Sequence, residues 1–176
     1  SLDALTGLPN RRALMEALPE AMARASRSAM PAALLFIDMD GFKAVNDTHG
    51  HEEGDELLRQ FGARLAAAVR MTDLVARLGG DEFVVVLEML ASPGDAEDTA
   101  HKLLACIREP YTLLTTDVTV GASIVVALFA PADKPDLDAW LARADHAMYA
   151  AKRDGKNAVR LAAVPVWHAA VTGTVS

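Results

Sequence analysis

The sequence of 176 residues contains a single cysteine, Cys106, and only 5% aromatic residues. One cysteine excludes a disulfide-stapled scaffold and suits a reducing compartment. No run of about 18 apolar residues occurs, and no secretory signal is recognisable, so no membrane contact is expected within this fragment. Positive charge is also scarce: 17 Lys and Arg against 24 Asp and Glu give a net charge of −7, which argues against a nucleic-acid partner. These absences predict a cytoplasmic segment, although the full-length protein can still be membrane-anchored elsewhere.

The composition is that of a folded domain. Apolar residues make up 52% of the chain and charged residues 23%, which excludes disorder as the main state. The length suits one domain. Since the chain begins at Ser1 rather than methionine, we expect it to be a piece of a longer protein. We assign residues 1–161 to the domain and residues 162–176, which lack a clear period, to a C-terminal tail or linker.

Apolar periodicity predicts alternating helices and strands. Strands are expected at residues 32–37, 74–78, 83–87, 111–116, 118–128 and 157–161, and helices at 10–30, 41–46, 51–70, 95–108 and 136–154. Pro19 interrupts the first helical stripe, where a kink or a break is expected. Gly79 and Gly80 separate two strand-like runs and predict a tight hairpin. Helices mixed with hairpins predict an α/β sandwich with antiparallel strand pairs.

Acidic side chains gather at predicted strand ends. Asp38 and Asp40 follow a buried strand and, with a period of two, point to one face. Asp81 and Glu82 lie on the hairpin turn. If the hairpin neighbours that strand, the carboxylates converge and require a divalent cation, for which hard oxygen ligands favour Mg²⁺ or Mn²⁺. Each pair alone is equally compatible with a helix N-cap or a solvated hairpin tip; the two together favour a metal site.

Lysines near predicted helix ends suggest phosphate binding. Gly41 and Lys43 open a helix directly after the acids, and the N–H groups of a helix start can bind phosphate. Lys152 and Lys156, four residues apart near the end of the last helix, could bracket a triphosphate. An ordinary strand-to-helix turn and a solvated, dipole-complementing helix end are the alternatives.

Asn46 and Asp55 could recognise a purine. A carboxylate accepts hydrogen bonds from the adjacent N1–H and N2–H₂ donors of guanine, and an amide both donates and accepts. Asp55 could equally be an acid in the first turn of a helix.

Five ordered segments together resemble the GGDEF family of diguanylate cyclases. They are residues 3–12, 36–47, 50–55, 79–83 and 144–157. The fourth, Gly79-Gly80-Asp81-Glu82-Phe83, is the signature that gives the family its name. The resemblance covers roughly residues 3–160.

The resemblance implies a palm-like nucleotidyl cyclase fold, with a central, mostly antiparallel sheet flanked by helices. It implies an enzyme that condenses two GTP into cyclic di-GMP, releases two pyrophosphates, depends on Mg²⁺ or Mn²⁺, and acts as a homodimer with one GTP in each domain. A sensor domain is expected in the full-length protein. The implied site residues are Asp38, the Met39 carbonyl, Asp81 and Glu82 for the metal, Asp81 and Glu82 for catalysis, Asn46 and Asp55 for guanine, and Phe42, Lys43, Lys152 and Lys156 for phosphates.

Arg70 and Asp73 resemble the family's inhibitory product site, an Arg-x-x-Asp shortly before the signature. Arginine suits the O6/N7 edge of guanine. The resemblance thus predicts feedback inhibition by cyclic di-GMP. A helix ion pair between residues three apart is the alternative.

Three positions depart from the family pattern. Lys156 stands where many members carry arginine, so charge remains but bidentate phosphate binding does not. Val125 stands where glycine is frequent and is expected to crowd the sheet. The second arginine that some members add to the product site is not evident in a region that has His101 and Lys102. A non-catalytic module that binds GTP or cyclic di-GMP and regulates an attached domain, and a protein-interaction scaffold, are the alternative functions.

Overall fold

The computed structural model describes residues 1–163, and it builds them around one five-stranded sheet. The elements in chain order are α1 (Arg11–Ser28), β1 (Ala32–Asp40), α2 (Phe42–His49), α3 (His51–Ala68), β2 (Leu74–Gly79), β3 (Glu82–Leu87), α4 (Gly94–Ile107), β4 (Tyr111–Thr112), β5 (Asp117–Val118), β6 (Gly121–Phe129), α5 (Leu137–Asp154) and β7 (Val159–Leu161). The predicted mixed α/β fold with a mostly antiparallel sheet and flanking helices is confirmed. The predicted tail from residue 164 onward lies outside the described residues.

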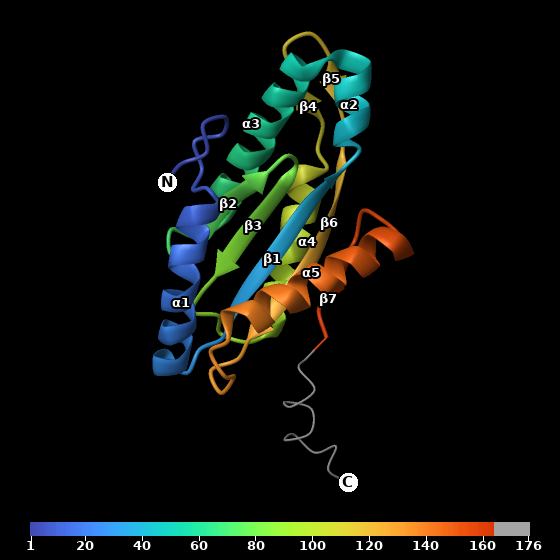
Figure 1. The fold of residues 1–176 in the computed structure, drawn as a ribbon. Helices are drawn as coiled ribbons and strands as arrows, with labels where there is room; N and C mark the ends of the chain where they lie inside the picture. Colours follow the sequence, from blue (N-terminus) through green and yellow to red (C-terminus); the bar gives the residue numbers. More distant parts are fainter. Residues whose placement is uncertain (164–176) are drawn as a thin grey trace.

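The strand order places the signature hairpin next to the central strand. The sheet runs β2-β3-β1-β6-β7, and only the pair β6–β7 is parallel. In the β1–β3 ladder, Asp38 lies opposite Glu82. Figure 1 shows the β2–β3 turn and the end of β1 at the same end of the sheet, beside α2. The hairpin therefore neighbours the first strand, as convergence of the acids requires.

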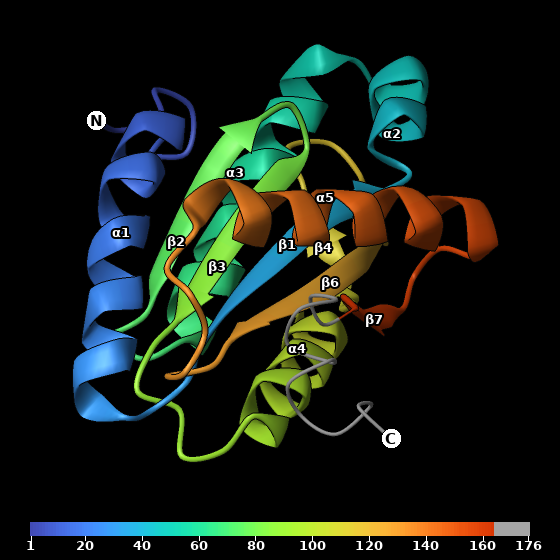
Figure 2. The same cartoon turned by 60° about the horizontal axis from the view of Figure 1, so that its bottom comes forward.

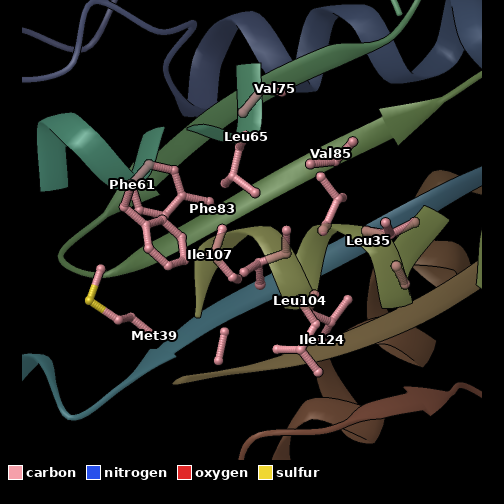
Figure 3. Close-up of a cluster of buried hydrophobic side chains, with 14 of the residues drawn as sticks. Leu35, Met39, Phe61, Leu65, Val75, Phe83, Val85, Leu104, Ile107 and Ile124 are labelled. Atoms are coloured by element: carbon pink, nitrogen blue, oxygen red, sulfur yellow. The ribbon is translucent and has the colours of Figure 1, made fainter. Parts of the chain in front are cut away.

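Alternation along β1 divides the core between two faces. Ala33, Leu35 and Ile37 pack toward α3 and α4, whereas Ala32 and Leu34 pack toward α1 and α5. Figure 3 shows the first face, with Phe61, Phe83, Leu104 and Ile107 among its buried side chains. Figure 2 shows α5 lying across the opposite face. Since residues 38 and 40 continue the alternation, their side chains emerge on the α5 face.

Several predicted strand boundaries were wrong. The single strand expected at 118–128 is divided, since β5 ends at Val118 and β6 begins at Gly121. The strand expected at 32–37 continues to Asp40, because its ladder with β6 runs to the pair Asp40↔Gly121. The strand expected at 111–116 is only two residues long: the Leu113 N–H donates to the Thr116 carbonyl at 2.9 Å, and this turn reverses the chain into β5.

Helix α1 runs through Pro19 without a break, so the proline does not split the helix. Pro19 lies on the exposed side of the helix, while Leu14, Leu18 and Met22 are buried against the sheet. The buried stripe holds the helix together although the proline removes one backbone donor. Within residues 1–163 the structure has no helix of the length and apolarity that a membrane crossing requires.

Candidate functional site

The predicted acids meet on the α5 face at the end of β1. Asp38 pairs in register with Glu82, and the Met39 N–H donates to the Asp81 carbonyl at 3.2 Å, so the turn residue lies directly against the strand. From α5, Lys152 extends its ammonium group to within 3.5 Å of Asp38 Oδ2 and 2.6 Å of the Asp40 Oδ1 atom. We call the set Asp38, Asp40, Asp81, Glu82 and Lys152 the strand-end site.

Negative charge dominates at Asp38. Burial of this carboxyl group, together with the charges of Asp81 and Glu82, raises its pKa to about 6, and the charge of Lys152 limits the shift. For Lys152 itself, burial lowers the pKa, but the hydrogen bond to Asp40 and the charge of Asp38 outweigh it, so the net pKa is raised. The lysine stays protonated and does not fully compensate the acids.

This donor set fits a magnesium ion that is shared with a substrate. Among residues 1–163, no group of three or more His, Cys, Asp or Glu side chains is arranged to hold a metal by itself. Mg²⁺ commonly binds through one or two carboxylates, with water and substrate phosphates completing its shell. Asp38, Asp81 and the Met39 carbonyl would be the protein ligands in such an arrangement. The raised pKa of Asp38, caused by burial and by neighbouring carboxylates, shows that its charged form is costly there.

Asn46, one of the two residues predicted to contact guanine, packs against Gly54 of α3. The Oδ1 atom of Asn46 is buried and has no hydrogen-bond partner within the described structure. A Cβ atom on Gly54 would lie 1.8 Å from it, so only glycine leaves space for this amide. The neighbouring Asp55 is exposed on the first turns of α3. A buried amide oxygen without a partner is costly unless a ligand satisfies it.

The predicted phosphate contacts are dispersed. Phe42 is half-buried against the core at the start of α2, whose N-cap, Gly41, has a φ of 92° and no side-chain cap. Lys43 is 89% exposed and pairs with Asp47 at 2.8 Å. Lys156 is exposed in the turn after α5. Of the four residues implied by the resemblance, Lys152 alone is seen to touch the strand-end acids.

Arg70 and Asp73 lie in a turn after α3, not within a helix as the ion-pair alternative supposed, because α3 ends at Ala68. Arg70 Nε and Nη2 donate to the two Asp73 oxygens at 3.1 and 3.0 Å, and Nη2 also donates to the Glu88 carbonyl. Asp73 accepts two further hydrogen bonds, from the N–H groups of Arg70 and Glu88, and its side chain is 2% exposed. We call these two residues the arginine turn.

A hollow of about 340 Å³ opens beside the arginine turn. Met89, Asp95 and Lys102 line it together with Arg70 and Asp73. Lys102 therefore supplies a cation near Arg70, where a second arginine is absent. A hollow of about 580 Å³ between the end of β6 and the start of α5 contains none of the predicted site residues.

The surroundings of Asp40 and Val125 could not be predicted from the sequence. The partners of Asp40 come from β6 and the turn after α5, and the only sequence signal for them was its spacing from Asp38. Val125, expected to crowd the sheet, is fully buried in a small cluster with Met148 and Ala151 of α5. Small residues such as alanine on α5 give the valine side chain space.

Comparison with known proteins gives a consistent answer. The family model described as "Diguanylate cyclase, GGDEF domain" matches residues 1–158. The bifunctional diguanylate cyclase/cyclic di-GMP phosphodiesterase MucR of Pseudomonas aeruginosa is 46% identical over 155 residues, covering 88% of this chain and 22% of MucR. The chain thus spans about a fifth of that relative.

Solved structures agree in fold. The GGDEF domain of TpbB from Pseudomonas aeruginosa superposes with a TM-score of 0.87 at 42% identity, covering 93% of this chain and 95% of that one. The coiled-coil and GGDEF domain of DgcB from Caulobacter crescentus, in complex with cyclic di-GMP, has a TM-score of 0.80 at 29% identity and covers 92% and 85%. The chain belongs to the GGDEF domain family.

Proposed function

We propose that this domain is a diguanylate cyclase, which joins two GTP into cyclic di-GMP and releases two pyrophosphates. The observation that carries the proposal is the proximity of Asp81 and Glu82 to the partly buried Asp38, whose pKa is raised to about 6 by burial first and by these two charges second. The names of the relatives support the same activity.

The roles follow from the chemistry of each group. Asp38, Asp81, Glu82 and the Met39 carbonyl would hold Mg²⁺ or Mn²⁺. The bound cation would lower the pKa of a 3′-hydroxyl and stabilise the attacking and leaving oxygens. Asp81, on the hairpin turn, would accept the hydroxyl proton. Lys152 complements the charge that develops on the phosphoryl oxygens.

The unpaired Asn46 Oδ1 atom and the exposed Asp55 carboxylate would bind the base. Gly54→Ala places a Cβ atom where the Asn46 amide lies, so we expect a rise of about tenfold in the KM for GTP. Gly94→Ala is the matched control, since its Cβ atom would meet only Ser92 Oγ at 3.9 Å.

Two copies of the domain would have to associate. Each holds one GTP, and the 3′-hydroxyl of one nucleotide attacks the α-phosphate of the other, so each copy supplies half of the reacting atoms. Holding the two nucleotides face to face contributes the proximity that a single domain lacks.

The test is incubation of the protein, both free and fused to a dimerising coiled coil, with GTP and Mg²⁺, with Asp81→Ala as control. We expect cyclic di-GMP from the wild type and none from Asp81→Ala. Tight GTP binding without product from the enforced dimer would instead identify a non-catalytic regulatory module. Failure to bind any guanine nucleotide would indicate an interaction scaffold.

We also propose that the arginine turn binds cyclic di-GMP and inhibits the enzyme. Arg70 lines the hollow beside Lys102, so two cations face one space. Arg70→Ala should lower the affinity for cyclic di-GMP, measured by calorimetry, by at least about tenfold. Equal affinity in wild type and variant would reject the product site.

A further inference from the structure

Asp40 is the most extensively bonded acid of the strand-end site, yet the proposed function gives it no role. Its Oδ1 atom accepts from Lys152 Nζ at 2.6 Å and its Oδ2 atom from the Asn157 N–H at 2.7 Å. The Ser123 hydroxyl lies 3.3 Å from both oxygens. The side chain is 11% exposed. Three separate elements thus fix the orientation of one carboxylate.

This orientation decides which acid holds the lysine. Lys152 Nζ is 2.6 Å from Asp40 but 3.5 Å from Asp38, so its short, charge-assisted hydrogen bond goes to Asp40. A lysine bound equally closely to Asp38 would place a unit positive charge where the proposed metal ion has to bind. At such distances two unit charges interact by several kcal/mol near a protein surface.

The same carboxylate holds the turn that follows α5. Asn157 has a left-handed φ of 58°, and its side-chain oxygen accepts from the Ala122 N–H at 3.4 Å. A Cβ atom on Gly121 would lie 2.5 Å from that oxygen, so glycine is required opposite Asp40 in the β1–β6 ladder. The turn that carries Lys156 is therefore anchored to the end of β1 through Asp40.

We propose that Asp40 is a positioning residue that binds Lys152 more closely than Asp38 does and so limits the contact of the lysine with Asp38, which remains available to a divalent cation, and that Asp40 anchors the turn bearing Lys156. The inference rests on the proposed function for the metal. It explains how the positive charge of Lys152 and that of the metal ion can occupy neighbouring positions. Asp40 itself does not have to touch the nucleotide.

The test is a double-mutant cycle read by Mn²⁺ binding, followed by electron paramagnetic resonance of the free ion. The four proteins are wild type, Asp40→Asn, Lys152→Met and the double variant. In wild type the lysine binds most closely to Asp40 but still lies 3.5 Å from Asp38, so Lys152→Met should tighten Mn²⁺ binding only about two- to threefold. In Asp40→Asn the lysine moves to Asp38, so binding should weaken by about fivefold or more, and Lys152→Met should then restore most of the loss.

Additive effects, with Lys152→Met acting equally in both backgrounds, would overturn the inference. Absence of Mn²⁺ binding by wild type would overturn it together with the metal site of the proposed function. A coupled cycle in a protein that makes no cyclic di-GMP would retain the inference and reject only the cyclase activity.

Matched variants separate positioning from folding. Asp154→Asn removes the same charge near the end of α5, where Asp154 is 58% exposed and pairs only with its neighbour Arg153 among the contacts described. It should leave Mn²⁺ affinity unchanged. If Asp40→Asn fails to fold, Ser123→Ala takes its place, because it removes one donor to Asp40 without changing charge. It should weaken Mn²⁺ binding, and Lys152→Met should tighten binding by a larger factor in the Ser123→Ala background than in wild type. No change in Ser123→Ala would then count against the inference.

Discussion

The strand-end site and the arginine turn both combine acids with cations, but their charges balance differently. In the arginine turn one guanidinium faces one carboxylate, and both Asp73 oxygens accept two hydrogen bonds each. The strand-end site has four acids and one lysine, which contacts only Asp38 and Asp40 among them, and the pKa of Asp38 is raised to about 6. The hydrogen bonds and charges of the arginine turn are therefore paired within it, whereas the strand-end site carries unbalanced negative charge.

The difference indicates how each region can use a ligand. A cation entering the strand-end site relieves repulsion that already exists there. A nucleotide at the arginine turn instead has to share Arg70 with Asp73, whose side chain is almost fully buried. Asp73 therefore serves mainly to position Arg70, and the exposed part of the guanidinium is what a ligand can reach.

The largest effect is expected for Asp38→Ala in the proposed cyclase. Loss of a carboxylate that would hold the metal should reduce cyclic di-GMP formation by about 10³-fold or more. Chromatographic quantification of product from the enforced dimer measures it. Retention of a tenth of wild-type activity would show that Asp38 is not part of the metal site.

Asp73→Ala should destabilise the fold more than any substitution in the strand-end site. It leaves the Glu88 N–H and the Arg70 guanidinium without their acceptor, which costs about 2–4 kcal/mol of unfolding free energy. Urea titration followed by circular dichroism measures the loss. Arg70→Ala, at a side chain that is 51% exposed, should cost about 1 kcal/mol. A smaller loss for Asp73→Ala than for Arg70→Ala would contradict the buried positioning role.

Asp38→Asn should act in the opposite direction on stability in metal-free buffer. The pKa of Asp38 is raised from 3.8 to about 6 in the folded state, so folding favours its protonated form. That contribution is complete below about pH 4 and is lost as the pH rises through 6. At pH 8 we therefore expect the variant to exceed wild type by about 1 kcal/mol after solvent screening, and at pH 4 to match it.

Thermal melts at both pH values, with EDTA present, measure this effect. A constant difference between Asp38→Asn and wild type across the range would contradict repulsion between the carboxylates as its cause. Added Mg²⁺ should reverse the order by stabilising only wild type.

The smallest effect is expected for Lys156→Arg. A guanidinium binds phosphate with two parallel hydrogen bonds where the ammonium group supplies a point charge. Because Lys156 is exposed, the KM for GTP should fall only about two- to threefold, with kcat nearly unchanged. Steady-state kinetics decide it, and an increase in KM would show that the turn cannot accommodate the larger head group.

Much of the fold could be read from local patterns. The buried strand before Asp38, the double-glycine hairpin and the apolar stripe of α3 all follow from periods of two and 3.6 residues. Boundaries were less accurate where contacts from elsewhere decide them. β1 extends to Asp40 because β6 pairs with it, and β4 is short because Glu53 of α3 accepts from the Leu114 and Thr115 N–H groups and fixes the turn.

The sequence by itself determined the family, most of the order of helices and strands, and the kinds of group available: carboxylates at strand ends, lysines near a helix end, and an arginine three residues before an aspartate. Only the tertiary structure decided which of these groups contact one another. Lys152 lies closer to Asp40 than to Asp38, and the backbone N–H of Asn157 donates to the same Asp40 carboxylate; these partners are 112 and 117 residues away along the chain. Periodicity arises from neighbours within one or two turns, whereas these contacts depend on how α5 crosses the sheet, which is set by packing between distant segments.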